Sequence, residues 1–132
     1  INLGETSNTP ISSLDIYPTL SAIAGIDLPN SEPFEGVNLL PLLMDKESEI
    51  SRDHFFWAGG RIGKNTGAIL KDGWKLVINH KGKDFLFNLE NDPNERINLI
   101  ANYPNRSNAL RSIFNNTLDE MPEPLTDRSK LK

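Results

Sequence analysis

The stretch AILKDGWKLVI (residues 68–78) decides the fold, because it predicts a β-hairpin. Asp72 and Gly73 form a two-residue pair that accepts positive φ at both positions, as the tight turn between two antiparallel strands requires. Counting outward from this turn places Lys71 opposite Trp74 on one side of the hairpin. The same count gives the next pairs, which alternate between the two faces: Leu70 with Lys75, Ile69 with Leu76, and Ala68 with Val77.

Alternating side chains continue on both sides of this hairpin. HFFWA (54–58) precedes it across the glycine-rich loop GGRIGKNTG (59–67), and FLFNL (85–89) follows it after the looser turn NHKGKD (79–84). Short alternating segments separated by turn residues are typical of an antiparallel meander. We therefore expect a small antiparallel β-meander of three to four strands.

A helix is predicted after the meander, from about 104 to 121. Its core-facing residues follow the spacing i, i+3, i+4, i+7, i+8 and i+11, which makes one continuous stripe. The members of the stripe are Leu110, Ile113, Phe114, Thr117, Leu118 and Met121. Such a stripe needs an apolar surface to cover it, and one face of the meander offers that surface. The predicted fold class is therefore α+β, with the C-terminal helix packed on the sheet.

The first third of the chain has the 3.6-residue period of helices instead. Ser12 and Asp15 have the spacing of a capping box, and Gly25 suits a left-handed helix end, so a helix is predicted over 15–25. The segment NLLPLLM favours a second, short helix over 38–44. Both helical segments precede the point at which the period changes from 3.6 to 2.

That change of period falls at the charged segment DKESEISRD (45–53), which is typical of a solvated connector. We place the domain boundary there. Residues 1–50 are expected to form one unit and residues 51–132 another.

Composition excludes several classes of function. The 132 residues contain 14 Lys and Arg against 18 Asp and Glu, so the net charge of −4 gives no reason to expect nucleic acid as a partner. No apolar run of the sequence approaches the roughly 20 residues that span a bilayer. The chain contains no cysteine, which excludes disulfides, thiolate metal sites and a cysteine nucleophile within it.

The segment DFLFNLENDPNERINL (84–99) begins as a strand and ends in strong turn residues. Pro93 presets its φ angle and Asp92 can accept local N–H bonds, so a turn is predicted after the last strand. Leu99 is then expected to fill the end of the core before the final helix. The segment is interpreted as a structural clasp from sheet to helix, in which no residue needs to perform chemistry.

Four motifs resemble the C-terminal part of the sulfatase family, in the family's order and spacing. They are SSLDIYPTLSAIAGIDLP (12–29), EGVNLLPLL (35–43), LKDGWKLV (70–77) and FLFNLENDPNERINL (85–99). In the family they correspond to a D-x-x-P-T helix that ends in A-G-I, a G-x-x-L-x-P-L segment, a D-G-x-W/Y-K-L hairpin and an L-Y-x-L-x-x-D-P-x-E-x-x-N-L clasp. The sequence departs from the family at Phe87, where Tyr is usual, and at Leu70, where Arg is frequent.

The resemblance implies a full-length enzyme that hydrolyses sulfate esters on a fold like that of alkaline phosphatase. It implies a formylglycine nucleophile and a calcium ion held by Asp and Asn side chains, both upstream of Ile1 in a large α/β domain to which residues 1–50 would also belong. SEPFEG (31–36) lacks the Arg of the nucleophile motif, and no Asp pair suited to the metal is present. Within this chain we therefore expect no catalytic and no metal-binding residue.

Several expectations about partners and location follow from the resemblance alone. The chain is predicted to be inert by itself, with the missing N-terminal catalytic domain as its partner. The full-length enzyme would act on a sulfated small molecule or glycan. Its location would be periplasmic or extracellular.

Three residues are candidates for the rim of a substrate site. Arg61 and Lys64 lie among the glycines of loop 59–67 and suit an anionic substrate, and His54 begins the preceding strand. The alternatives are an ordinary solvated loop and a packed or surface histidine. Likewise Trp74 is either a sugar platform or a packing residue with a cation–π contact, and Asp15 is either a ligand or a helix cap.

Two other functions stay open beside the sulfatase interpretation. The chain is alternatively the C-terminal part of a phosphodiesterase or phosphonate hydrolase of the same superfamily. It is otherwise a non-catalytic α+β binding module. The residue at the nucleophile position upstream of Ile1 discriminates among the three, because formylglycine is made only from Cys or Ser in its motif.

Overall fold

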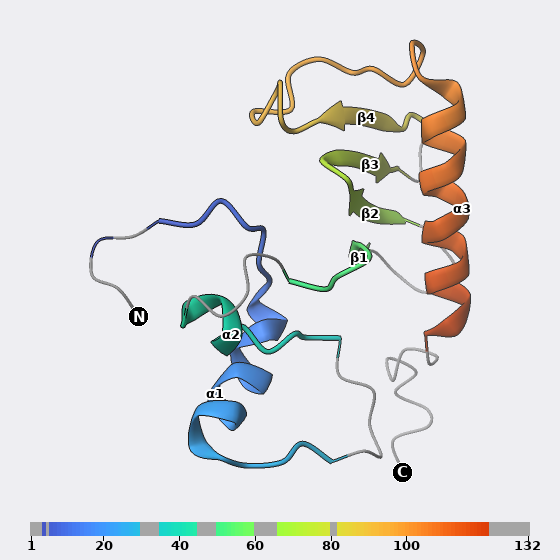
Figure 1. The fold of residues 1–132 in the computed structure, drawn as a ribbon. Helices are drawn as coiled ribbons and strands as arrows, with labels where there is room; N and C mark the ends of the chain where they lie inside the picture. The colour runs from blue at the N-terminus through green and yellow to red at the C-terminus, as the bar shows by residue number, and fades with distance from the viewer. Residues whose placement is uncertain are drawn as a thin grey trace. The chain divides into compact units, whose positions relative to one another are not determined.

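The computed structural model describes Gly4 and residues 6–29, 35–44, 50–59, 66–79 and 82–121. The chain divides into two compact units, Ile1–Asp53 and His54–Lys132, called here the N-terminal unit and the C-terminal unit. The elements of both are labelled in Figure 1.

The N-terminal unit is helical. A 3-10 turn, η1 (Ser13–Asp15), leads directly into α1 (Ile16–Ala24), and Gly25 ends the helix in the left-handed conformation with φ of 67°. The helix predicted over 15–25 is thus present, with its first turn in the tighter 3-10 geometry. The predicted second helix is shorter than 38–44: α2 covers Leu40–Leu43, with Pro41 in its first turn.

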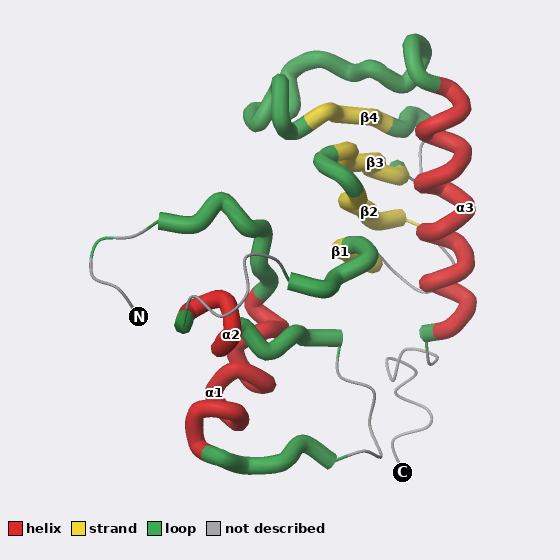
Figure 2. Tube along the Cα trace, viewed as in Figure 1, coloured by secondary structure: helices red, strands yellow, loops and turns green. Residues whose placement is uncertain are grey.

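The C-terminal unit contains one four-stranded antiparallel sheet in the order β1-β2-β3-β4. Its strands are β1 (Phe55–Gly59), β2 (Thr66–Lys71), β3 (Trp74–Ile78) and β4 (Phe85–Asn88). The long loop after β4 leads to α3 (Pro104–Glu120), as Figure 2 shows. The α+β class and the meander topology are as predicted.

The predicted hairpin register is confirmed pair by pair. Lys71 pairs with Trp74, and the pairs further out are Leu70 with Lys75, Ile69 with Leu76, and Ala68 with Val77. The turn has φ of 50° at Asp72 and 73° at Gly73. A positive φ at both positions matches the right-handed twist of the flanking strands, which is why this dipeptide fixes the register.

Helix α3 covers one face of the sheet (Figure 1). The buried core between them consists of Ile69, Leu76, Ile78, Leu86, Leu110 and Phe114. Ile113 and Leu118 pack against this core, whereas Met121 lies beyond the end of α3 and is 38% exposed. Gly67 leaves room for the helix, because a Cβ there would lie 2.0 Å from the Trp57 carbonyl oxygen and 2.9 Å from the Phe114 ring.

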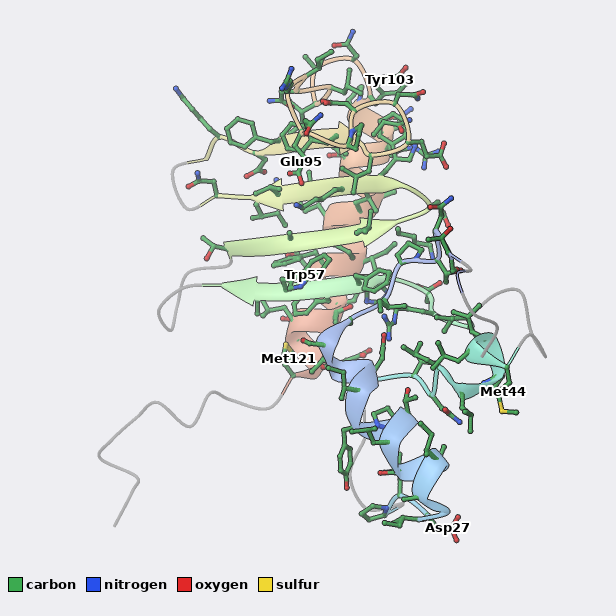
Figure 3. All side chains as sticks on the ribbon, turned by 90° about the vertical axis from the view of Figure 1, so that its left-hand side faces the viewer. Asp27, Met44, Trp57, Glu95, Tyr103 and Met121 are labelled. Atoms are coloured by element: carbon green, nitrogen blue, oxygen red, sulfur yellow. The ribbon has the colours of Figure 1, made fainter. Side chains whose placement is uncertain are left out.

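The opposite face of the sheet carries aromatic side chains. Phe55 and Trp57 of β1 stack with ring centroids 6.0 Å apart, and Phe85 and Phe87 of β4 stack at 6.2 Å. Figure 3 shows Trp57 on the side of the sheet turned away from α3. The sheet therefore has apolar side chains on both faces.

Candidate functional site

The carboxylate of Asp15 is the most buried polar group of the N-terminal unit. The residue has no exposed surface, and its two oxygen atoms accept the N–H of Ser12 at 2.7 Å and of Val37 at 2.9 Å. One oxygen also forms an ion pair with Arg52. The predicted capping role is confirmed, and the carboxylate also connects segments that are far apart in the sequence.

Thr19 of the same motif makes a second connection. Its hydroxyl donates to the Asp15 carbonyl oxygen at 2.6 Å and accepts the N–H of Leu39 at 2.9 Å. Gly36 allows the segment to approach, because a Cβ at that position would lie 2.0 Å from the Leu14 carbonyl oxygen. The D-x-x-P-T and G-x-x-L motifs are therefore two halves of one structural unit.

Ionisation of Asp15 is set by opposing effects. Burial favours the neutral carboxyl, but hydrogen bonds from Arg52, Val37 and Ser12 together outweigh it and lower the pKa of Asp15 below its ordinary value. The group is therefore ionised at neutral pH. Sequence reasoning missed Arg52, which is 37 positions away and carries no local signal of the pairing.

The predicted clasp is confirmed in its turn chemistry. One oxygen of Asp92 accepts the backbone N–H of Arg96 at 2.7 Å and of Ile97 at 2.8 Å. Glu95 adopts a positive φ of 54°, and its carboxylate pairs with Lys75 of β3 at 2.6 Å. The turn is thereby fixed both to itself and to the sheet.

The end of the clasp binds the outer edge of β4. The N–H of Leu99 donates to the Leu86 carbonyl oxygen at 2.8 Å, and the Asn98 side chain accepts the Leu86 N–H at 3.0 Å. The prediction that Leu99 fills the core is wrong in detail: it is Ile100 that packs against the core. Leu99 contributes its backbone instead, which covers an otherwise open sheet edge.

His54 lies at the boundary of the C-terminal unit, just before β1. Its Nε2 is 3.1 Å from the Thr117 hydroxyl, which itself donates to the Ile113 carbonyl oxygen at 3.0 Å. With that hydroxyl proton directed to Ile113, the Nε2–H tautomer of His54 completes the pair by donating to the Thr117 oxygen. His54 thus joins the start of β1 to α3, and its place on a substrate rim stays a prediction.

Other predicted features can be located only in part. Arg61 and Lys64 lie outside the described residues. Among the residues that the structure describes, no group of three or more His, Asp and Glu side chains could hold a metal ion. None of the described helices has the length and apolar character needed to cross a membrane.

Relatives among known proteins are sulfatases. Arylsulfatase K of Bos taurus is 32% identical over 80% of this chain and 22% of its own length. An arylsulfatase of Clostridium perfringens is 32% identical over 97% of this chain and 27% of its own. The chain therefore spans only about a quarter of the length of these relatives. No protein-family model matches it.

Solved structures share the fold. An enzyme solved with its substrate D-glucosamine-2-N,6-O-disulfate matches 90% of this chain and 26% of its own with a TM-score of 0.70 at 22% identity. The phosphonate monoester hydrolase of Agrobacterium radiobacter matches 76% of this chain and 24% of its own with a TM-score of 0.53 at 26% identity. Both enzymes are much longer than the matched region.

Fold and motifs together define the class that the chain resembles, because it shares its fold with one segment of larger sulfatase and phosphonate hydrolase structures. The sequence relatives within that class are sulfatases. The chain is similar to a sulfatase-like C-terminal part, as the four motifs predict.

Proposed function

We propose that the chain is the structural C-terminal part of an enzyme that hydrolyses sulfate esters. The observation that carries the proposal is the similarity to an arylsulfatase over 97% of the chain. It is supported by the structural roles of the matched motif residues, since Asp15, Thr19 and Asp92 all bind backbone groups of their own unit. None of these three needs a substrate to satisfy its polar atoms.

The chemistry of the reaction explains why such a chain needs a partner. Cleaving a sulfate ester places negative charge on the leaving oxygen and on the sulfate oxygens, so it requires an activated nucleophile and fixed cations. In the full-length enzyme a formylglycine and a calcium ion would supply them. We assign both to residues outside this chain, which by itself is expected to be inert.

The contribution of this chain to such an enzyme would be support and substrate recognition. Loop 59–67 joins β1 to β2, and we propose that Arg61 and Lys64 line the rim of the substrate site, with His54 nearby in sequence. Cations at a rim bind anionic groups by charge-assisted hydrogen bonds. The substrate would be a sulfated small molecule or glycan, and the enzyme periplasmic or extracellular.

A phosphonate monoester hydrolase is the second candidate, because one such enzyme shares the fold at 26% identity. Sulfate monoesters and phosphonate monoesters each carry one negative charge, but a phosphonate has a carbon substituent on phosphorus where a sulfate has a third non-bridging oxygen on sulfur. An enzyme tuned to one transition state is therefore expected to favour it in kcat/KM. A non-catalytic binding module is the third candidate and would hydrolyse neither.

The full-length protein distinguishes these candidates in one assay. We expect it to hydrolyse 4-nitrophenyl sulfate with a kcat/KM well above that for 4-nitrophenyl phenylphosphonate. Faster hydrolysis of the phosphonate would favour the second candidate. No hydrolysis of either substrate, together with the lack of a Cys or Ser nucleophile motif upstream of Ile1, would favour the third.

A further inference from the structure

A cavity of about 590 Å³ lies between the β2–β3 turn and the first half of α3. We call it the hairpin groove. Its polar lining includes Lys71 and Asp72 from the turn and Arg106 from α3, and its apolar lining includes Ala109, Leu110 and Ile113. All of these residues belong to the C-terminal unit.

The aromatic side chain of Tyr103 lines the groove and packs against Trp74. The ring of Tyr103 packs on Trp74, with centroids 4.9 Å apart and an interplanar angle of 59°, and Tyr103 is still 46% exposed. Figure 3 shows Tyr103 at the start of α3. An aromatic ring that is held on one side and open on the other can pack against the C–H face of a sugar.

A cation is held beside this ring. The guanidinium carbon of Arg106 lies 4.9 Å from the centroid of the Trp74 ring. No hydrogen bond or ion pair engages Arg106 among the described residues, so its N–H groups can donate to a bound anion. Lys71 lines the groove from β2 beside the carboxylate of Asp72, and the Glu90 carboxylate lies next to Gly73 of the same turn. Arg106 is therefore the cation on which anion binding in the groove depends.

The start of α3 adds to the positive character of the groove. The helix begins at Pro104 and no side-chain hydrogen bond from Tyr103 caps it. The first N–H groups of a helix point outward and carry the positive end of its dipole. They add to the positive charge that Arg106 brings to the groove.

We propose that the hairpin groove binds one sulfated sugar unit of an oligosaccharide. The sugar packs on Tyr103, and its sulfate accepts hydrogen bonds from Arg106 and Lys71. The choice of sulfate among anions rests on the proposed function, whereas the aromatic and cationic geometry does not. The groove thus gives the C-terminal unit a recognition role of its own for polymeric substrates.

Calorimetry on the chain tests the proposal with three probes. These are a sulfated heparin hexasaccharide, the same hexasaccharide after chemical desulfation, and inorganic sulfate. We expect the sulfated hexasaccharide to bind at least tenfold more tightly than either of the others. Arg106→Gln and Tyr103→Ala should each weaken its binding about tenfold, as for the loss of a charge-assisted hydrogen bond or a stacking contact.

Matched variants distinguish binding in the hairpin groove from general electrostatic attraction between the oligosaccharide and exposed cations. Arg96→Gln removes an equally exposed cation from the clasp and should leave the affinity unchanged, and Arg106→Lys should retain most of it. Equal weakening by Arg106→Gln and Arg96→Gln would overturn the proposal, as would equal affinity for the desulfated hexasaccharide. Equal affinity for inorganic sulfate would show an anion site without sugar recognition and would overturn it too.

A spectroscopic readout keeps the test independent of variant stability. In nuclear magnetic resonance of the unmodified chain, the hexasaccharide should shift the amide signals of Asn105, Arg106 and Lys71. Shifts confined to other parts of the chain would contradict the groove. None of these measurements depends on catalytic turnover. A failure to bind would therefore not contradict the proposed sulfatase activity, and a lack of sulfatase activity would not change how the binding data are interpreted.

Discussion

At the scale of single residues, Asp15 organises the N-terminal unit. Its buried carboxylate binds the backbone of Ser12 and Val37 and the side chain of Arg52, which come from three separate segments. A fold tolerates a buried charge when hydrogen bonds and an ion pair satisfy it. Removing one charge of a buried ion pair leaves the other charge uncompensated and destabilises the fold. Substitution of Asp15 is therefore expected to destabilise this unit.

Asp15→Asn is expected to lower the free energy of unfolding of the N-terminal unit by about 3–5 kcal/mol at neutral pH, since the largely buried Arg52 then loses its ion pair with Asp15. Amide hydrogen exchange at Val37 and Leu39 reports this loss. Asp27→Asn is the matched control, because Asp27 is exposed in the same unit. Equal protection in the two variants would contradict the anchoring role of Asp15.

The lowered pKa of Asp15 gives the same contribution a pH dependence. An Asp binds protons with a pKa of about 3.9 in an unfolded chain, so above that pH the stabilisation is fully present. It is lost as the pH falls through the lower folded-state pKa. Below about pH 4, the stability difference between the unmodified chain and Asp15→Asn should therefore shrink, and a constant difference down to acid pH would contradict this.

A further residue-scale prediction concerns Arg61 and Lys64 of loop 59–67, the proposed rim of the substrate site. In the full-length enzyme, Arg61→Ala should raise KM for the natural sulfated substrate by an amount equivalent to about 1.5–3 kcal/mol, the usual value of a hydrogen bond to a charged group. A small aryl sulfate that does not reach the rim should be hydrolysed as before. Unchanged kinetics with the natural substrate for both Arg61→Ala and Lys64→Ala would exclude the loop from the site.

At the scale of elements, the clasp protects the edge of the sheet. Asn98 accepts the N–H of Leu86 at 3.0 Å and of Ile100 at 3.1 Å, and donates to the Asp84 carbonyl oxygen at 3.3 Å. The Asn98 side chain thereby forms hydrogen bonds at the outer edge of β4 of the kind that a neighbouring strand would otherwise supply. This explains why the strand ends in so definite a turn and then returns to apolar residues.

Asn98→Ala should lower the free energy of unfolding of the C-terminal unit by about 1–3 kcal/mol, because it leaves the N–H of buried Leu86 without an acceptor. Urea unfolding followed by Trp fluorescence measures the change. Asn94→Ala provides the control, since Asn94 is an exposed residue of the same loop. A similar stability for both variants would mean that the edge does not depend on Asn98.

Local patterns predicted those elements whose partners are near in sequence. The Asp72-Gly73 turn fixed the register of β2 with β3, and the Ser12–Asp15 spacing located the capping box. Partners that depend on how elements pack were not predictable. Arg52 is 37 positions from Asp15 and meets it only in the folded N-terminal unit, and Arg106 reaches Trp74 only through the placement of α3 on the sheet.

The same reasoning explains the incorrect detail in the clasp. Leu99 and Ile100 are adjacent apolar residues, and alternation alone does not decide which of them faces the core. The hydrogen bond from Leu99 N–H to Leu86 decides it, and it places Ile100 inward. A tertiary backbone contact of this kind leaves no mark on the sequence.

At the scale of the whole molecule, the two units differ in how they bury apolar surface. The C-terminal unit has a core that includes the fully buried Ile69, Leu76, Leu86 and Phe114. In the N-terminal unit Ile16, Leu20 and Ile23 of α1 are 57%, 58% and 59% exposed, respectively. Large exposed apolar patches are unusual on monomeric proteins and typically mark surfaces that another part of the protein covers.

This difference predicts the order of local unfolding. In the isolated chain, amides of α1 and α2 should exchange with solvent before those of β2, β3 and α3, because the N-terminal unit has less buried apolar surface to lose. Hydrogen exchange followed by mass spectrometry resolves the two groups. Equal protection of both would indicate that the N-terminal unit is self-sufficient, contrary to the proposed dependence on a larger domain.

The division of labour between this chain and the rest of the enzyme is tested most directly by one parallel assay. The chain alone and the full-length protein are each incubated with 4-nitrophenyl sulfate, with and without calcium. We predict turnover by the full-length protein and none by the chain under either condition. Calcium-dependent hydrolysis by the chain alone would contradict the account, because it would place the nucleophile and the metal site within these 132 residues.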